Sequence, residues 1–283
     1  MKNNFEEIRD KFIHLFGRPY YINEHGIIFC IDTLEALELI NFKFINLIIT
    51  SPPYNIGKEY ENILPINEYV NWLIKWINKA YQLSLDNSSM LLNLGYINID
   101  DIGRAIPIPY LIWDKIPYYL NQEIVWNYSA GVACKKYLSP RNEKILWYVK
   151  DRYNYTFNLD DIRDKNVKYP NSKKNGKVRV NTLGKNPSDV WEIAKVTTGL
   201  NRSSKERTEH PCQFPMDLLE RAVLGFSNEN DVVFDPFIGS GSTFEACIKF
   251  NRFCIGFEIQ KKYCEIIKHR IKNIENNYNL VLS

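Results

Sequence analysis

Residues 232–243 read VVFDPFIGSGST, and this stretch decides the fold. A short apolar run ends at Asp235, a turn with two glycines follows, and an apolar pattern at helical spacing continues to about residue 251. A second apolar run over 253–257 ends at Glu258, and another helical pattern follows it. Strand, glycine turn, helix and strand in this order form a βαβ unit, which predicts adjacent parallel strands in an α/β sheet.

The glycine turn and the acid after it have the spacing of a nucleoside cofactor site. Gly239 and Gly241 let the backbone approach a ligand, and Glu258 ends the next strand, 17 residues after Gly241, where it can accept bonds from both ribose hydroxyls. Phe244 stands where a dinucleotide fingerprint has its third glycine, so the pattern favours a nucleoside without a pyrophosphate. The glycines alone also fit a structural turn, and Asp235 alone fits a helix-capping acid.

Apolar patterns elsewhere predict more of the same sheet on both sides of an irregular middle region. Nearly continuous runs are typical of parallel strands buried on both faces, and amphipathic spacing predicts helices. The predicted helices cover 4–16, 69–81 and 216–227, and the predicted strands cover 26–31, 44–50, 90–94, 123–126 and 145–149. Three prolines leave 100–120 unassigned, and 151–209 lacks a sustained period. We therefore expect one α/β domain made of residues 1–150 and 210–283, with a loop-rich insert at 151–209.

A rigid polar turn follows the predicted strand 44–50. Thr50-Ser-Pro-Pro-Tyr-Asn55 lies at the carboxyl edge of the sheet, where α/β proteins place their ligands, and two prolines stiffen it. The Ser51 hydroxyl and a backbone carbonyl can act as fixed acceptors, and the Tyr54 ring offers a stacking face. An exocyclic amino group of a base matches, because two acceptors on its N–H bonds restore electron density to a nitrogen whose lone pair is conjugated into the ring. A Pro-Pro turn with a packed tyrosine fits the same residues.

The small net charge of +3 hides an uneven distribution. Residues 134–210 hold 18 Lys and Arg against nine Asp and Glu, a balance of +9, which leaves −6 for the rest of the chain. Such a basic segment suits a polyanion, although a solvated loop would show the same charge. The basic residues that we assign to DNA contact are Lys165, Lys168, Lys173, Lys174, Lys177, Arg179, Lys185, Arg202, Lys205 and Arg207.

The overall composition excludes several classes of protein. With 45% hydrophobic and 24% charged residues, the chain is globular and not intrinsically disordered. No apolar run approaches the length of a membrane span, and the charged start lacks a secretory signal. Six cysteines without a C-x-x-C pair, and four scattered histidines, show no zinc spacing. We expect a soluble cytoplasmic protein with reduced thiols.

Together the motifs resemble those of the amino-group DNA methyltransferases that use S-adenosylmethionine. The order of catalytic block, target-recognition region and cofactor block matches the β class of that family, and the resemblance covers most of the chain. The matching segments are TSPPYN (50–55) for the catalytic loop, DPFIGSGST (235–243) for the methionine-side cofactor loop, GFE (256–258) for the ribose-binding acid and HPCQFP (210–215) for the segment before the cofactor strand.

The resemblance implies a circularly permuted, Rossmann-like methyltransferase fold with the target-recognition region at 151–209. It implies catalytic roles for Ser51, Pro52, Pro53, Tyr54 and Asn55. It implies cofactor-binding roles for Asp32, near the adenine, and for Asp235, Pro236, Phe237, Gly239, Ser240, Gly241, Ser242, Thr243 and Glu258. Two residues depart from the common pattern: Ser242 replaces a threonine, and Phe214 replaces a lysine, which leaves the contact to the cofactor carboxylate unassigned.

The implied reaction is methylation of duplex DNA without a metal, in a prokaryotic cytoplasm, with a cognate restriction endonuclease as a partner and either a monomer or a homodimer as the active form. Family members with serine at the first position of the tetrapeptide mostly methylate cytosine N4, and those with aspartate mostly methylate adenine N6. Ser51 therefore favours cytosine, with adenine as the alternative, because both side chains can accept the amino hydrogen bond. The target base must leave the stack to reach the methyl donor.

Two other interpretations use the same residues. Pro211-Cys212 resembles the nucleophile of enzymes that methylate cytosine at ring carbon 5, but Cys212 precedes the cofactor strand and is better explained as a buried structural thiol. A DNA-binding module without catalysis would explain the basic insert. It would not explain Glu258 in register with the glycine turn.

Overall fold

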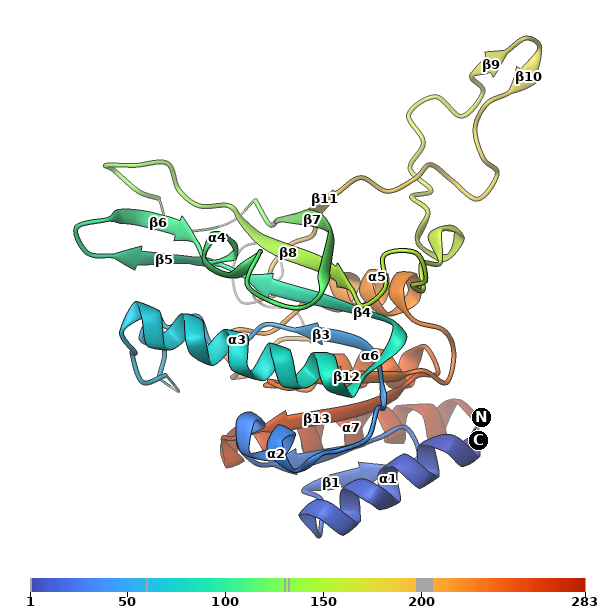
Figure 1. Cartoon of the computed structure of the whole chain (residues 1–283). Coiled ribbons are helices and arrows are strands. Elements are labelled where there is room, and N and C mark those ends of the chain that lie inside the picture. The colour runs from blue at the N-terminus through green and yellow to red at the C-terminus, as the bar shows by residue number, and fades with distance from the viewer. Residues whose placement is uncertain (1, 60, 130, 132, 197–205, 283) are drawn as a thin grey trace.

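A nine-stranded sheet runs through the centre of the molecule, in the order β1-β2-β13-β12-β3-β4-β8-β7-β11 (Figure 1). The structure is a computed structural model that describes residues 2–59, 61–129, 131, 133–196 and 206–282. The strands are β1 (Tyr21–Asn23), β2 (Gly26–Cys30), β3 (Ile45–Thr50), β4 (Ser84–Leu94), β5 (Tyr96–Ile99), β6 (Gly103–Pro107), β7 (Tyr119–Asn127), β8 (Asn142–Val149), β9 (Lys173–Lys174), β10 (Lys177–Val178), β11 (Val190–Glu192), β12 (Val232–Asp235) and β13 (Phe253–Glu258). The helices are α1 (Lys2–Phe16), α2 (Thr33–Leu39), α3 (Ile66–Leu83), α4 (Pro109–Ile112), the 3₁₀ turn η1 (Leu159–Ile162), α5 (Met216–Phe226), α6 (Ser242–Lys249) and α7 (Lys261–Leu282).

Five neighbouring strands, β2, β13, β12, β3 and β4, are parallel and form the core of the sheet. The βαβ unit predicted from residues 232–258 is confirmed as β12, α6 and β13. Strand β12 pairs with β3, so the last quarter of the chain completes a sheet begun by the first. This is the α/β, Rossmann-like architecture that the sequence predicts.

Helices cover both faces of the sheet and bury two separate apolar clusters. Helices α1, α2 and α3 pack on one face, and α5, α6 and α7 pack on the other. Successive side chains of a strand point to opposite faces, so Ile27 and Phe29 of β2 enter the first cluster and Ile28 enters the second. Burial on both faces explains the nearly continuous apolar runs in the sequence.

An antiparallel extension follows β4. Strand β8 pairs antiparallel with both β4 and β7, which turns the amino end of β8 toward the carboxyl end of β4. The unassigned residues 100–120 contain part of the hairpin β5–β6 and the short helix α4. Two of the prolines that prevented an assignment lie at element boundaries, because Pro107 ends β6 and Pro109 begins α4.

A strand of the main sheet lies within the described part of the predicted insert. Strand β11 pairs parallel with β7 and buries Trp191, and this strand was not predicted within the loop-rich insert 151–209. Three residues are too few to produce a recognisable period. Farther out, the hairpin β9–β10 projects from the body of the molecule (Figure 1). Asn158 anchors the start of the insert by donating to the carbonyls of Leu224 and Ser227 at 3.2 and 2.9 Å.

Candidate active site

One cavity of about 1050 Å³ opens at the carboxyl ends of β12 and β3 and contains both motifs found in the sequence. Chain order reverses between these two strands, since β3 leads to β4 on one side and β12 leads to β13 on the other. Such a switch point leaves a crevice above the strand ends. Ser51 to Asn55 line one part of the cavity, and Asp235 to Ser240, Ser242, Thr243 and Glu258 line another.

Asp235 braces the two motifs against each other. One carboxylate oxygen accepts from Thr50 Oγ1 at 2.9 Å and from the Phe237 amide at 3.2 Å, and the other accepts from Thr243 Oγ1 at 2.7 Å. Burial raises the pKa of Asp235 to about 6, against the lowering effect of these three donors. The side chain therefore holds the end of β3, the cofactor loop and the start of α6 together.

The glycine turn passes close to a buried histidine. Gly239 has φ +53°, and a Cβ atom there would lie 2.8 Å from His210 Nε2. Gly241 has φ +77° and precedes the first residue of α6, and Ser240 and Ser242 share a hydrogen bond of 3.0 Å between their hydroxyls. Burial lowers the pKa of His210 to about 4, so its ring is neutral at pH 7. The absence of a Cβ atom at Gly239 therefore lets the turn pass directly beside the His210 ring.

Glu258 ends β13 inside the cavity. Its carboxylate accepts backbone N–H bonds from Gly239 at 3.0 Å and Gln260 at 2.8 Å, which fix its direction. Burial raises the pKa of Glu258 to about 7 even though these amides favour the charged form. Each carboxylate oxygen retains a second lone pair for a ligand hydroxyl.

Asp32 and Phe237 form another part of the cavity lining. Asp32 follows β2 and caps α2, because its carboxylate accepts from the Glu35 amide at 3.1 Å. Thr33 donates to the carbonyl of Pro236, which joins α2 to the cofactor loop. The Phe237 ring packs against Trp72 and Trp76 of α3 at 5.5 and 5.3 Å between ring centroids.

Hydrogen bonds hold the turn Ser51-Pro-Pro-Tyr-Asn55 from both sides. Asn55 adopts φ +60° and clamps Leu64 with two bonds, from Asn55 Nδ2 to the carbonyl at 2.8 Å and from the Leu64 amide to Asn55 Oδ1 at 2.7 Å. Tyr69 donates to the carbonyl of Pro53 at 2.8 Å. Glu61 accepts from the amide of Tyr54 at 2.7 Å, and it also accepts from those of Ile56 and Lys58.

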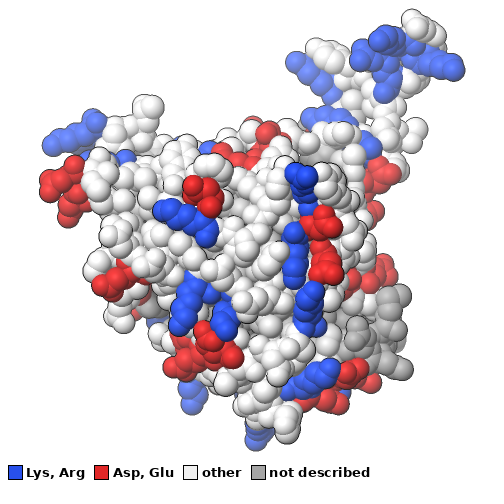
Figure 2. All heavy atoms as spheres, in the orientation of Figure 1, with Lys and Arg blue, Asp and Glu red and all other residues white. Residues whose placement is uncertain are grey.

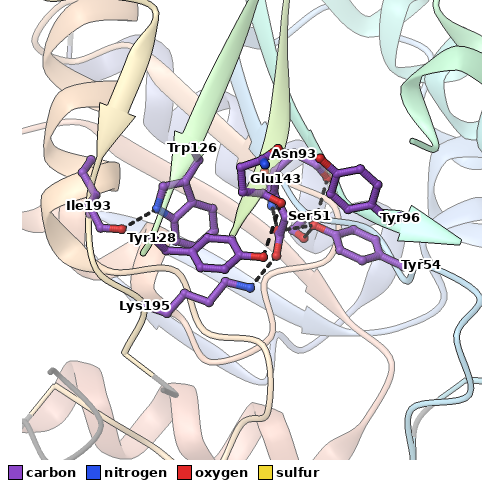
Figure 3. A network of polar contacts seen from close by, with 10 residues as sticks. Ser51, Tyr54, Asn93, Tyr96, Trp126, Tyr128, Glu143, Ile193 and Lys195 are labelled. Carbon is purple, nitrogen blue, oxygen red and sulfur yellow. Dashed lines mark hydrogen bonds and ion pairs between the residues drawn. The ribbon is translucent and has the colours of Figure 1, made fainter. Parts of the chain in front are cut away.

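A polar network surrounds the hydroxyl of Tyr54 (Figure 3). It lies 2.7 Å from Ser51 Oγ, 3.0 Å from Glu143 Oε2 and 2.7 Å from the amide nitrogen of Asn93. That nitrogen also donates to Glu143 Oε2 at 2.7 Å, and Lys195 Nζ contacts Glu143 Oε1 at 2.5 Å. Asn93 is buried, and its side-chain oxygen has no hydrogen-bond partner within the described part of the chain.

Burial and the negative charge of Glu143 raise the pKa of Tyr54 well above its ordinary value of 10, so the phenol keeps its proton. Its ring lies over Gly95, where a Cβ atom would be 2.8 Å from Tyr54 Cε2. Burial alone would lower the pKa of Lys195, but the Glu143 carboxylate and Tyr128 outweigh it and the pKa is raised.

Three aromatic residues of the cavity lining lie beside the network: Trp126, Tyr128 and Phe214. The Trp126 indole donates to the carbonyl of Ile193 at 2.7 Å, and Lys195 Nζ lies 3.9 Å from the Tyr128 ring centroid. Phe214, the residue that replaces a lysine of the family pattern, packs against Trp126 with ring centroids 6.1 Å apart. Lys195, which contacts the Trp126 and Tyr128 rings, belongs to the predicted insert and not to the 210–215 segment.

Cys212 is exposed and lines the cavity, so the expectation of a buried structural thiol was wrong. Its backbone N–H donates to His210 Nδ1 at 3.2 Å, which holds the turn before α5. The residues around Cys212, HPCQFP (210–215), have no periodic pattern from which burial could be predicted.

Most of the basic residues assigned to DNA contact are exposed, and those of β9 and β10 gather on the projecting hairpin (Figure 2). Lys185 is bridged to Asp164 at 3.0 Å. Arg207 lies apart from the hairpin and lines the cavity. Arg202 and Lys205 fall outside the described residues. Among residues that are described, no group of three or more His, Cys, Asp or Glu could hold a metal ion, and no helix is long and apolar enough to cross a membrane.

Sequence reasoning missed Glu61, Asn93, Gly95, Glu143 and Lys195. Asn93 and Gly95 lie at the end of the predicted strand 90–94, and the rule that ligands bind at carboxyl ends of parallel strands could have identified them. Glu143 is the second residue of the antiparallel strand β8, and only the pairing of β8 with β4 shows that its first residues lie at the same edge of the sheet.

The chain is similar to known DNA methylases along most of its length. A family model for N6/N4 methyltransferases, described as "DNA methylase", matches residues 45–269. The type II methyltransferase M.ScaI of Streptomyces caespitosus is 49% identical over 256 residues, which cover 90% of this chain and 84% of that protein. The DNA adenine methyltransferase YhdJ of Escherichia coli (strain K12) is 31% identical, over 93% of this chain and 86% of that protein.

Solved structures share the fold. PvuII DNA methyltransferase, titled cytosine-N4-specific, superposes with a TM-score of 0.71 at 20% identity, over 94% of this chain and 96% of its own. The M1.HpyAVI–SAM complex superposes with a TM-score of 0.59 at 24% identity, over 87% of this chain and 98% of its own. The family match and the identity to M.ScaI, together with a site that brings TSPPYN beside DPFIGSGST, show that the chain belongs to the N6/N4 family of DNA methylases.

Proposed function

We propose that the protein transfers a methyl group from S-adenosylmethionine to the exocyclic N4 of cytosine in duplex DNA. The observation that carries this proposal is the position of Ser51 in the same cavity as Glu258 and the glycine turn. The name of M.ScaI as a type II methyltransferase supports a role as the modification enzyme of a restriction-modification system, acting in the cytoplasm beside a cognate endonuclease.

The residues present fit the cofactor. The Glu258 carboxylate, held by two backbone amides, suits the two ribose hydroxyls, and Asp32 suits the adenine amino group. Gly239 and Ser240 of the glycine turn line the same cavity as Glu258, so the turn lies beside this carboxylate. Asp235 and Thr243 belong to this site because the hydrogen bond between their side chains holds the glycine turn in place. When bound, the cofactor supplies an electrophilic methyl group.

Ser51 and the carbonyl of Pro52 orient the target amino group, and the Tyr54 ring stacks on the base. Two acceptors on the amino hydrogens increase electron density on a nitrogen that is otherwise a poor nucleophile. Asn55 maintains the turn through its clamp on Leu64. After transfer, the nitrogen gives up its surplus proton to solvent.

Access to the base requires its extrusion from the duplex, because the amino group of a stacked and paired base cannot reach a methyl donor in a cavity. The basic hairpin β9–β10 supplies contacts to the phosphate backbone, and other insert residues read groove edges. Such binding is strongly salt-dependent.

Adenine N6 is the second candidate, because an adenine amino group presents the same two N–H donors and YhdJ carries adenine in its name. Ser51 favours cytosine through the resemblance to serine-containing members. A neutral hydroxyl differs from a carboxylate here chiefly in acceptor strength.

Nucleoside mass spectrometry of DNA from cells that express the protein tests the proposal. We expect N4-methylcytosine. N6-methyladenine would instead support the second candidate function, and 5-methylcytosine would contradict methylation of an amino group. The absence of any modified base would contradict the proposal that the protein is a methyltransferase. Tritiated cofactor with and without DNA separates a methyltransferase from a binding module.

A further inference from the structure

The hydroxyl of Tyr54 has more polar neighbours than it can donate to. It carries one hydrogen, yet Ser51 Oγ, Glu143 Oε2 and the backbone carbonyl of Asn93 lie at 2.7, 3.0 and 3.3 Å (Figure 3). The Asn93 amide nitrogen, at 2.7 Å, can only donate to it. The direction of the bond between Ser51 and Tyr54 therefore depends on which neighbour receives the Tyr54 hydrogen.

Glu143 decides that direction. Paired with Lys195 at 2.5 Å and receiving a bond from Asn93, it is an ionised carboxylate that can only accept. An oxygen lone pair of Tyr54 turned toward it at 3.0 Å would be repelled, whereas an O–H donated to a carboxylate makes a strong charge-assisted bond. Tyr54 therefore donates to Glu143, and the 2.7 Å contact with Ser51 exists because Ser51 donates to Tyr54.

This direction determines what Ser51 offers to the cavity. With its only hydrogen used on Tyr54, Ser51 presents lone pairs alone, and those match the N–H bonds of an amino group. In the reverse direction, Ser51 would have a free O–H, which could turn toward the amino hydrogens and repel them.

We propose that Glu143 and Lys195 are positioning residues for methyl transfer, which fix the direction of the hydrogen bond between Tyr54 and Ser51 so that Ser51 meets the target amino group as an acceptor. This inference rests on the proposed amino methylation. Neither residue touches the reacting atoms, and each acts through Tyr54.

A double-mutant cycle tests the proposal in the full-length protein. Tyr54→Phe retains the ring and removes the hydroxyl, and Glu143→Gln removes the charge. We expect each to lower kcat for methylation of duplex DNA by roughly 10- to 100-fold, the scale of losing one oriented polar contact to the transition state. The double variant should have a kcat within about threefold of Tyr54→Phe, because Glu143 has nothing to act on without the hydroxyl.

Lys195→Met replaces Glu143→Gln in the cycle if Glu143→Gln does not fold. The thermal transition of Glu143→Gln and its Kd for S-adenosylhomocysteine show whether it folds. The loss of kcat caused by Lys195→Met should also disappear in the Tyr54→Phe background. The Kd of Lys195→Met for S-adenosylhomocysteine should differ from the wild-type value by less than about threefold. Glu123→Gln is the matched control, because Glu123 of β7 pairs at 3.3 Å with Lys144, the residue after Glu143 on β8, without entering the network.

The proposal would be overturned if the kcat of a double variant fell by the product of the two single losses. It would also be overturned if Glu143→Gln and Lys195→Met had the same kcat as the control. Its failure is separate from that of the proposed function. The wild-type protein decides the latter through its nucleoside product, and the cycle applies equally if that product is N6-methyladenine, since both amino groups donate.

Discussion

Thr50 Oγ1 donates a hydrogen bond of 2.9 Å to Asp235 Oδ1 and so joins the last residues of β3 and β12, which lie 185 residues apart in the chain. Both strands end at the cavity, and each leads directly into one of its motifs. The turn after β3 and the glycine turn after β12 are therefore both linked to one buried carboxylate, that of Asp235. Their spacing is set by this side chain as well as by strand pairing.

Thr50→Val should destabilise the fold without changing its shape. Valine has the volume of threonine but leaves Asp235 Oδ1 with one donor fewer, and loss of a buried bond to a charged group costs about 1.5–3 kcal/mol. Urea unfolding would measure the difference in the free energy of unfolding. Thr182→Val, at an exposed position of the insert, is the control and should change it by less than about 0.5 kcal/mol. If the two variants had the same free energy of unfolding, the hydrogen bond between Thr50 and Asp235 would not stabilise the fold.

Gly95→Ala should impair catalysis by displacing Tyr54. A methyl group at 95 would lie 2.8 Å from Tyr54 Cε2, closer than any tolerated contact, so the ring must shift and its hydroxyl must leave the network. We expect kcat to fall on the order of tenfold or more, with a stability cost of about 1–3 kcal/mol for overpacking. Steady-state methylation and thermal unfolding measure the two effects. Wild-type kcat in this variant would show that the position of the ring is not critical.

The predicted and missed residues differ in how local their signals are. The βαβ unit and the polar turn after β3 were predictable because strand, turn and helix signals lie within a few residues of each other. Glu143 and Lys195 were not, because each reaches the cavity only through pairing of antiparallel β8 with β4 and of the three-residue β11 with β7. Glu61 acts through backbone amides that any sequence carries, so its side chain had no distinctive pattern.

Cofactor affinity should depend on pH through Glu258. Its carboxyl has a pKa of about 7 in the folded protein, raised by burial, so it is mostly protonated below that pH and charged above it. The charged form accepts both ribose hydroxyls, and the Kd for S-adenosylhomocysteine should therefore weaken by up to roughly tenfold as pH falls from about 8 to 6. Isothermal titration calorimetry measures this. Glu258→Gln should bind more weakly and lose the pH dependence; a slope that persists in that variant would assign the effect to another group.

The hairpin β9–β10 should contribute phosphate contacts. Replacing Lys173, Lys174 and Lys177 by alanine should weaken DNA binding and reduce the slope of log K against log salt by about 0.9 for each lysine that neutralises a phosphate. The control replaces three lysines of α3 and α6 and changes the net charge equally: Lys75 and Lys79, which pair with Glu38 of α2, and Lys249, which pairs with Glu220 of α5. Fluorescence anisotropy over a salt series separates the two variants. Identical slopes would mean that only net charge matters.

Cys212→Ser tests whether the exposed thiol in the cavity takes part in chemistry. Amino methylation needs no covalent bond between enzyme and base, so this variant should keep kcat within about threefold of the wild type. Ring-carbon methylation would require a thiolate to add to cytosine, and serine in its place would abolish turnover. DNA that contains 5-fluorocytosine adds an independent readout, because it traps an enzyme that adds to the ring as a covalent complex and releases one that does not. A trapped complex in the wild type and its loss in Cys212→Ser would contradict the amino mechanism, whereas free enzyme in both leaves Ser51 and Tyr54 as the groups that act on the base.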